Sequence, residues 1–371
     1  MNEIQTGLII TVPGSGEKYS LIRKLGQGGF GEVWLANRLE DKHHRIAIKF
    51  FKPLHVDDRK LFLAEYQRSA NFHHEDILPS LFYGEWNSRL FMGMEFCEFG
   101  TAAQFIGNLN PNKEGDEALI WNFIYDTASG LQYLHEVENV VHQDIKPDNV
   151  MINSEGDFVI MDFGISVCVN SDIQLSNYCA FGSPAYMAPE RFSDSKSIIY
   201  ANDIWSLGVS IYEMAVGVLP FNGLGGEYAG VELPSLPNGW SDQLNKVMQS
   251  CFVHQTWLRK RAVELKQYAE WILNGKKGSD PWGGYIPQQP DSFINNIQNN
   301  QNSQTPSSIK GKSTQRNASN NNSGRDTMRN SLSQGNNNSE VSNSNNDVRP
   351  INNKSKNILG KISDWANKLL H

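Results

Sequence analysis

The sequence predicts an α+β protein in which a strand-rich part comes first, a helix-rich part follows and a polar tail ends the chain. Between residues 19 and 96, short β-prone segments are bounded by turn residues, with one segment of helical spacing among them. From residue 97 to 273 the apolar residues recur mainly at helical spacing. At 291–350, 33 of the 60 residues are Asn, Ser or Gln, a composition that cannot bury a core.

The strand-rich part contains four clear strand patterns and one helix pattern. The strands are predicted at Leu21–Lys24, Glu32–Asn37, Arg45–Phe51 and Arg89–Phe96, and the helix at Arg59–Ala70. In the second part, apolar residues from Ile120 to Leu134 form one helical stripe, and Asp203–Ala215 is apolar on nearly every face, which indicates a buried helix. Between them, Ser154–Asp157 joins two apolar runs and predicts a hairpin.

The tail has two predicted segments. Residues 274–353 form a disordered linker, and residues 354–371 form a basic amphipathic helix with Ile358, Ile362, Trp365 and Leu369 on one face and a net charge of +3. Such a helix suits a partner protein, the rest of this chain or an anionic membrane surface. The alternative is a nascent helix with no dedicated partner.

Composition narrows the class of protein. The 371 residues carry a formal net charge of −7, which argues against broad nucleic-acid binding, so no nucleic-acid partner is expected. No apolar run reaches 18 residues, and the apolar stretch Gly7–Val12 follows no basic segment, so neither a membrane span nor a secretory signal is expected. The four scattered cysteines lack metal or redox spacing and favour a reducing, cytoplasmic location.

A glycine-rich run, "GQGGFGEV" at Gly26–Val33, lies between two predicted strands. Glycines let backbone amides approach phosphate oxygens without a Cβ in the way. Dinucleotide-binding folds share this spacing, but they need a helix directly after the glycines. The following "EVWLAN" is β-prone, which favours a phosphate-binding loop between strands.

Lys49 stands in the apolar strand pattern "IAIKF", sixteen residues after Val33. Burying an ammonium group there is costly unless it is paired, and Glu65 on the next predicted helix is the candidate partner. The plainer alternatives are a solvated edge lysine and a surface Glu65 that pairs with Arg68.

The strongest signal is "HQDIKPDN" (His142–Asn149) followed by "DFG" (Asp162–Gly164), with the predicted hairpin between them. Asn149 and Asp162 offer the oxygen ligands that Mg²⁺ prefers. Asp144 has the chemistry to orient and deprotonate a hydroxyl, and Lys146 to neutralise a transferring phosphoryl group. Single Asp and Asn residues in loops are usually caps or turn formers. Four at these offsets, downstream of the glycine run and Lys49, outweigh that interpretation.

With these motifs in order, the chain from 19 to 273 resembles the eukaryotic-type protein kinases. Further matches are "GSPAYMAPE" at 182–190 and "DIWSLG" at 203–208. The resemblance implies a bilobal fold, with a small β-rich N-lobe (19–96) containing one helix, a larger α-helical C-lobe (97–273) and ATP between them. Lys146 together with Ser183 resembles the serine/threonine-specific branch.

The resemblance also implies roles for single residues. Lys49 would hold the α- and β-phosphates and pair with Glu65, Asn149 and Asp162 would bind Mg²⁺, and Asp144 would accept or orient the substrate hydroxyl. ATP would contact Gly26, Gln27, Gly28, Gly29, Phe30, Gly31, Val33, Ala47, Lys49, Met94, Glu95, Cys97 and Met151.

Structural roles follow from the same resemblance. His142 and Phe163 would belong to a buried spine, Asp203 would brace the catalytic loop, and Glu190 would pair with Arg261.

Three departures from the family pattern stand out. Gln143 replaces the usual Arg that grips a phosphorylated loop, so we expect little dependence on phosphorylation at Ser171, Ser176 or Tyr178. Ser69 replaces an apolar spine residue, which predicts loose coupling of its helix to the DFG segment. The region 220–243 is short and Gly-rich, which predicts that its substrate-docking surface differs from that of better-known family members.

The sequence therefore predicts an ATP- and Mg²⁺-dependent protein serine/threonine kinase with protein substrates. The alternative is a pseudokinase that binds nucleotide as a scaffold, but such proteins usually lack at least one of Lys49, Glu65, Asp144, Asn149 and Asp162. A kinase of small molecules is a third possibility, which "GSPAYMAPE" disfavours.

Overall fold

The computed structural model describes residues 3–28, 31–52, 56–164, 166–168, 182–192, 198–228 and 233–287, and residue 360. Residues 288–353 of the predicted linker and, apart from Gly360, the predicted tail helix therefore lie outside the described residues. Residues 274–287 of that linker are described, and the Trp282 ring among them lies 4.3 Å from the ring of Tyr268. No helix within these described ranges is long and apolar enough to cross a membrane.

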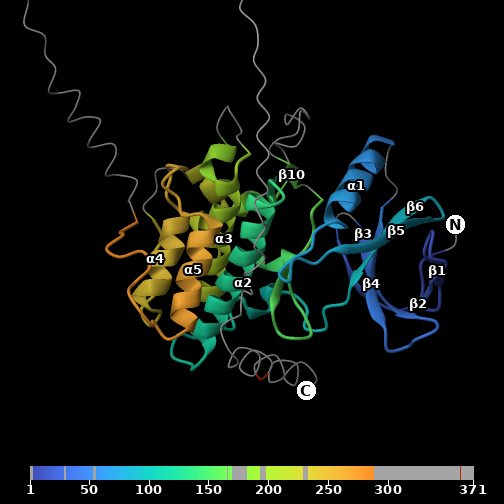
Figure 1. Cartoon of the computed structure of the whole chain (residues 1–371), viewed down its shortest axis with the longest axis horizontal. Coiled ribbons are helices and arrows are strands. Elements are labelled where there is room, and N and C mark those ends of the chain that lie inside the picture. The colour runs from blue at the N-terminus through green and yellow to red at the C-terminus, as the bar shows by residue number, and fades with distance from the viewer. Residues whose placement is uncertain are drawn as a thin grey trace, which may run out of the picture. The chain divides into compact units, whose positions relative to one another are not determined.

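The first part of the chain is an antiparallel sheet with one helix beside it (Figure 1). Its strand order is β1-β2-β3-β4-β6-β5. The elements are β1 (Ile9–Thr11), β2 (Lys18–Gln27), β3 (Gly31–Arg38), β4 (Arg45–Phe51), α1 (Val56–Ser69), β5 (Ser80–Trp86) and β6 (Arg89–Glu95). The four predicted strands and the predicted helix are all present, and β1 and β5 are additions that the sequence patterns did not single out.

Strand β4 is buried on both faces because its side chains alternate between two apolar clusters. Ile46, Ile48 and Phe50 pack into one cluster, while Ala47 and Phe51 pack into the other, which also contains Phe62 of α1. The period of two places Lys49 on the second face, toward α1.

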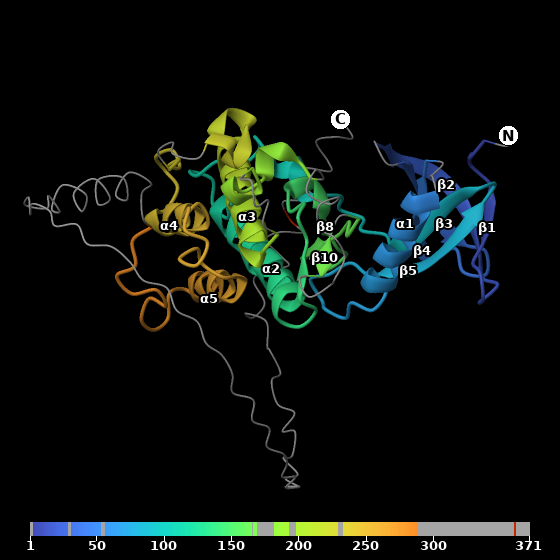
Figure 2. The same cartoon turned by 90° about the horizontal axis from the view of Figure 1, so that it is seen from above.

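The second part is helical, as predicted. Its elements are α2 (Asp116–Glu136), β7 (Val140–Val141), β8 (Val150–Ile152), β9 (Phe158–Ile160), β10 (Val167–Cys168), α3 (Tyr200–Val216), α4 (Asp242–Cys251) and α5 (Ala262–Leu273). Helix α3 is buried on most of its faces and packs against α2 and α4, which Figure 2 shows around it.

The predicted hairpin is β8–β9, with Met151 opposite Val159. A small strand-rich lobe and a larger helical lobe are therefore confirmed.

Candidate active site

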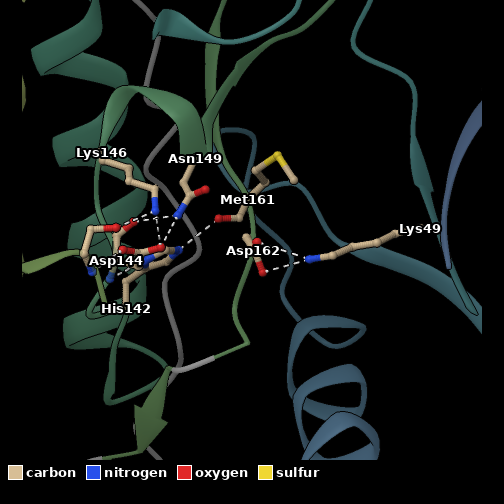
Figure 3. Close-up of polar contacts among 8 residues, drawn as sticks. Lys49, His142, Asp144, Lys146, Asn149, Met161 and Asp162 are labelled. Atoms are coloured by element: carbon tan, nitrogen blue, oxygen red, sulfur yellow. Dashed lines mark hydrogen bonds and ion pairs between the residues drawn. The ribbon is translucent and has the colours of Figure 1, made fainter. Parts of the chain in front are cut away.

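Lys49 lies on β4 with its ammonium group facing Asp162 (Figure 3). Its Nζ donates to both carboxylate oxygens of Asp162, at 3.3 and 3.2 Å, and only 9% of Lys49 is exposed. Burial alone would raise the pKa of Asp162, but the Lys49 ammonium and its hydrogen bonds outweigh that effect and hold the pKa below its ordinary value. Two charges 113 residues apart in sequence therefore form one ion pair.

The predicted partner Glu65 lies on α1, but its side chain is outside the described part of the structure. The Lys49–Glu65 pair stays a prediction.

Asp144 is held by three donors around its carboxylate. Lys146 Nζ and Asn149 Nδ2 each lie 2.7 Å from Oδ2, and the Ser183 backbone amide donates to Oδ1 at 3.1 Å. Lys146 Nζ also donates to Ser183 Oγ at 2.7 Å. Figure 3 shows Lys146 and Asn149 converging on Asp144. The catalytic-loop motif and the "GSPAYMAPE" motif thus meet at one carboxylate.

Asn149 connects this carboxylate to the DFG segment. Its Nδ2 bonds to Asp144, and its backbone carbonyl accepts from the amide of Met161 at 2.9 Å, directly before Asp162. Because Nδ2 is used as a donor, Oδ1 is the amide atom suited to a metal. An amide oxygen and a carboxylate on adjacent strand ends are a donor set that fits Mg²⁺, which takes its other ligands from water and phosphate.

Asp203, at the start of α3, holds the backbone of the catalytic loop. Its two carboxylate oxygens accept from the amides of His142 at 2.9 Å and Gln143 at 2.8 Å, and from His135 Nε2 at 2.8 Å. Gln143 has a left-handed backbone with φ 70°, and Asp162 has φ 67°. Non-glycine residues in this region are strained and persist where their surroundings hold them, often at functional sites.

The rings of His142 and Phe163 lie 5.2 Å apart between centroids, and Phe163 also contacts Phe72 at 5.1 Å. His142 and Phe163 are nearly fully buried, which agrees with a packing role. His142 Nε2 bonds to the Met161 carbonyl at 3.0 Å, linking the two motifs once more.

The glycine loop is the turn between β2 and β3. Gly29 and Phe30 lie outside the described residues. A Cβ on Gly31 would come within 2.0 Å of the Phe50 carbonyl oxygen, so packing alone requires glycine there. A Cβ on Gly26 or Gly28 would meet no atom within 4 Å, and β-sheet packing does not explain those two glycines.

Most of the residues predicted to contact the base share one apolar cluster. Ala47, Met94 and Cys97 are buried in it, with Val33 and Met151 packed against it. Glu95 ends β6, next to this cluster, and is exposed. Burial raises the pKa of the Cys97 thiol to about 12, so the thiol is protonated at neutral pH.

Lys49 and Asp162 line a small cavity that sequence patterns did not reveal. Its lining comprises Lys49, Leu78, Pro79, Ser80, Met92, Met94, Met161, Asp162 and Phe163. Leu78 and Ser80 come from a stretch with no motif of its own, so no sequence signal pointed to them.

One predicted pair is wrong. Glu190 pairs with Arg259, at 2.8 Å, and not with Arg261. Arg261 instead lies 3.5 Å from Glu264 and is 72% exposed. Both arginines stand in an irregular segment before α5, where side-chain direction cannot be counted from a helical or strand period.

The Gly-rich region after α3 packs onto the "GSPAYMAPE" segment. The Gly226 amide donates to the Met187 carbonyl at 2.8 Å, and a Cβ on Gly226 would lie 2.2 Å from the Pro189 nitrogen. Glycine is therefore required by close approach. Ser171, Ser176 and Tyr178, on whose phosphorylation we expect activity to depend little, lie outside the described residues.

Comparison with known proteins agrees with this geometry. The family model described as "Protein kinase domain" matches residues 19–268. The chain is 29% identical over 269 residues to MAP3K epsilon protein kinase 1 of Brassica napus, covering 70% of this chain and 20% of that protein. It is 29% identical to a probable serine/threonine-protein kinase of Dictyostelium discoideum, covering 70% of this chain and 38% of the relative.

A third relative is the calcium/calmodulin-dependent protein kinase kinase of Caenorhabditis elegans, 30% identical over 55% of this chain and 42% of its own length. The chain thus spans less than half the length of each of these three relatives.

Proposed function

The chain belongs to the eukaryotic-type protein kinases of the serine/threonine-specific kind, and we propose that it transfers the γ-phosphoryl group of Mg-ATP to Ser or Thr hydroxyls of protein substrates. The observation that carries the proposal is the pair of contacts made by Asn149, whose side chain bonds to Asp144 and whose backbone carbonyl bonds to Met161, the residue directly before the DFG segment. Asn149 thereby links Asp144, the proposed proton acceptor, to the proposed metal-binding pair of Asn149 and Asp162.

Asp144 acts on the substrate hydroxyl. Its carboxylate is oriented by Lys146, Asn149 and the Ser183 amide, so it is fixed before a substrate arrives and needs no reorganisation during the reaction. It positions the attacking oxygen and accepts its proton. Lys146 remains beside it to balance the charge that builds up on the transferring group.

Lys49 binds the α- and β-phosphates, with Gly26, Gln27, Gly28, Gly29, Phe30 and Gly31 covering them. Val33, Ala47, Met94 and Met151 hold the base, with Glu95 and Cys97 at its edge. Asn149 and Asp162 hold Mg²⁺, which when bound neutralises phosphate charge and orients the γ-phosphoryl group. Glu65 pairs with Lys49 in the active arrangement. In this proposal, catalysis comes from positioning and electrostatics.

The test measures transfer of radiolabelled phosphate from ATP to a generic basic protein and to the chain itself. Asp144→Ala should lower the transfer rate at least a hundredfold. Glu155→Ala, on the exposed β8–β9 turn, should leave the rate unchanged. Equal label with wild type and Asp144→Ala would refute the mechanism. ATP binding that depends on Lys49, with no transfer by wild type, would instead support a nucleotide-binding scaffold.

We also propose a cytoplasmic location and a docking role for residues 354–371. Cys97 and Cys251 are buried free thiols, which suits a reducing compartment. The basic amphipathic pattern of the last residues suits an anionic membrane surface or a partner protein. Sedimentation with vesicles of anionic or neutral lipid, for the whole chain and a chain ending at residue 353, separates these cases. If the chain ending at residue 353 no longer binds anionic vesicles, membrane binding by residues 354–371 is supported. If neither chain binds vesicles of either composition, membrane binding is contradicted.

A further inference from the structure

Two buried serines form a hydrogen bond between α1 and β5. Ser69 is the last residue of α1 and Ser80 the first of β5, and their Oγ atoms lie 2.7 Å apart. They are 1% and 8% exposed. A hydroxyl pair in such surroundings is costly unless both groups are satisfied.

Each hydroxyl has a second partner, so the pair needs no water. Ser80 Oγ lies 2.9 Å from Met92 Sδ, and Ser69 Oγ lies 3.3 Å from the carbonyl of Tyr66. A hydroxyl has one proton to donate. The bonds therefore run either from Ser69 through Ser80 to Met92, or from Ser80 through Ser69 to Tyr66. In both directions the Ser69–Ser80 link is kept.

This bond is the inner end of a row of contacts between α1 and β5. At the exposed end, Arg59 pairs with Glu85 at 2.6 Å. In the middle, the rings of Phe62 and Tyr66 lie 6.2 and 4.5 Å from that of Tyr83. Positions 59, 62, 66 and 69 are one stripe of the helix, running against β5 in the opposite direction.

The inner end of the row reaches the active site. Ser80 lines the same cavity as Lys49, Asp162 and Phe163. Among the described elements, β5 is the one that α1 contacts most. The Ser69–Ser80 bond is therefore the contact between α1 and β5 that lies at the active-site end of the helix.

We infer that Ser69 and Ser80 are positioning residues for phosphoryl transfer: their hydrogen bond fixes α1 against β5 beside the Lys49–Asp162 pair. The inference rests on the proposed function. In place of packing between apolar side chains, a directional bond of fixed length sets the separation of helix and strand. Loss of that bond lets the end of α1 move away from the cavity without exposing a polar group, because each serine has its second partner.

The test uses a matched pair at position 80. Ser80→Thr keeps the hydroxyl, and Ser80→Val replaces it with a methyl group at nearly the volume of threonine. If the positioning of the site depends on one hydrogen bond, loss of that bond corresponds to about a fivefold decrease in kcat. We expect Ser80→Val and Ser69→Ala each to lower kcat about fivefold, with Ser80→Thr close to wild type. Ser210→Ala, a buried serine bonded within α3, is the control and should leave kcat unchanged.

The two sites should also be non-additive, since either change breaks the same link. Ser69→Ala combined with Ser80→Val should be no slower than the slower single variant. Hydrogen exchange of the last turn of α1 should quicken in Ser80→Val but not in Ser80→Thr, and this readout does not require activity. If wild type transfers no phosphate, the exchange result still decides the link. Equal kcat and equal exchange in the Thr and Val variants, or fully additive losses, would overturn the inference.

Discussion

Arg259 and Glu190 form a buried, two-pronged ion pair, with Nη1–Oε1 at 2.8 Å and Nη2–Oε2 at 3.1 Å. The Arg259 side chain is fully buried and also donates to the carbonyls of Ala201 and Val253. It ties the segment before α5 to the end of the "GSPAYMAPE" motif. Such a pair is weak as a source of net stability, but losing one partner leaves the other charge buried.

Arg259→Ala should therefore lower the free energy of unfolding by about 3–5 kcal/mol. Arg261→Ala is the matched control, because its side chain is exposed and its pair with Glu264 is worth about 0.5 kcal/mol or less. Urea unfolding followed by tryptophan fluorescence measures both. Equal losses in the two variants would contradict the assignment.

Lys146 offers the sharpest test of charge balance at the site. Its Nζ touches Asp144 and Ser183 at 2.7 Å each. Lys146→Ala should lower kcat by about a hundredfold, with KM for ATP changed little, because the cation acts on the transferring group. Ser183→Ala removes one contact of the same ammonium but keeps the Asp144 pair, and should cost about tenfold or less. A kcat within threefold of wild type for Lys146→Ala would exclude this role.

Glu32 should make the stability of the sheet depend on pH. Its carboxylate lies 2.7 Å from Lys24 Nζ and 2.9 Å from Arg89 Nη1, and it accepts from Trp34 Nε1 at 3.2 Å. Burial raises the pKa of Glu32, but these hydrogen bonds lower it by more, so the pKa lies below its ordinary value. The pKa of a glutamate in the unfolded chain is about 4.3. Because the pKa of Glu32 is lower than this in the folded protein, its ionised carboxylate stabilises the fold at pH values above about 4.3, and this stabilisation is lost as the pH falls through the folded pKa.

Glu32→Gln should lower the free energy of unfolding by about 1–2 kcal/mol at pH 7. The difference from wild type should narrow as the pH is lowered below about 4. Glu85→Gln is the control, since Glu85 is exposed and its pair with Arg59 contributes little. Urea titrations at several pH values measure both, and a difference that does not change with pH would contradict the prediction.

Much of the site could be predicted because its motifs are short and locally ordered. The period of two along "IAIKF" places Lys49 with Ala47 on one face of β4, and the turn at Ser154–Asp157 brings Asn149 back toward Asp162. These conclusions need only strand alternation and a tight turn.

Other features depend on three-dimensional packing that no local pattern encodes. Arg259 and Arg261 differ by two residues in an irregular segment, and only the folded chain shows which one reaches Glu190. The sequence marks Ser69 only as a departure from the family pattern, and no sequence signal indicates that it bonds to Ser80. The left-handed backbone of Gln143 is likewise imposed from outside, by hydrogen bonding to Asp203.

Strand β1 was not predicted from the sequence, and it lies before the residues that match the family model. It pairs with β2, and the Leu21 backbone exchanges further bonds with Gly7 and Leu8 at 2.8 and 2.9 Å. Ile10 is 1% exposed and packs in the cluster of Trp34. Because β2 continues into the glycine loop, β1 supports one side of the proposed phosphate-binding turn.

Ile10→Ala should lower the free energy of unfolding by about 2–5 kcal/mol, from lost burial and the cavity that remains. Ile9→Ala is the control on the same strand, since Ile9 is 50% exposed and alternation points it away from the core. Urea unfolding measures the stability, and KM for ATP should rise in Ile10→Ala but not in Ile9→Ala, because only Ile10 anchors the strand beside β2. If the two variants lose the same stability, β1 is not packed as part of this sheet.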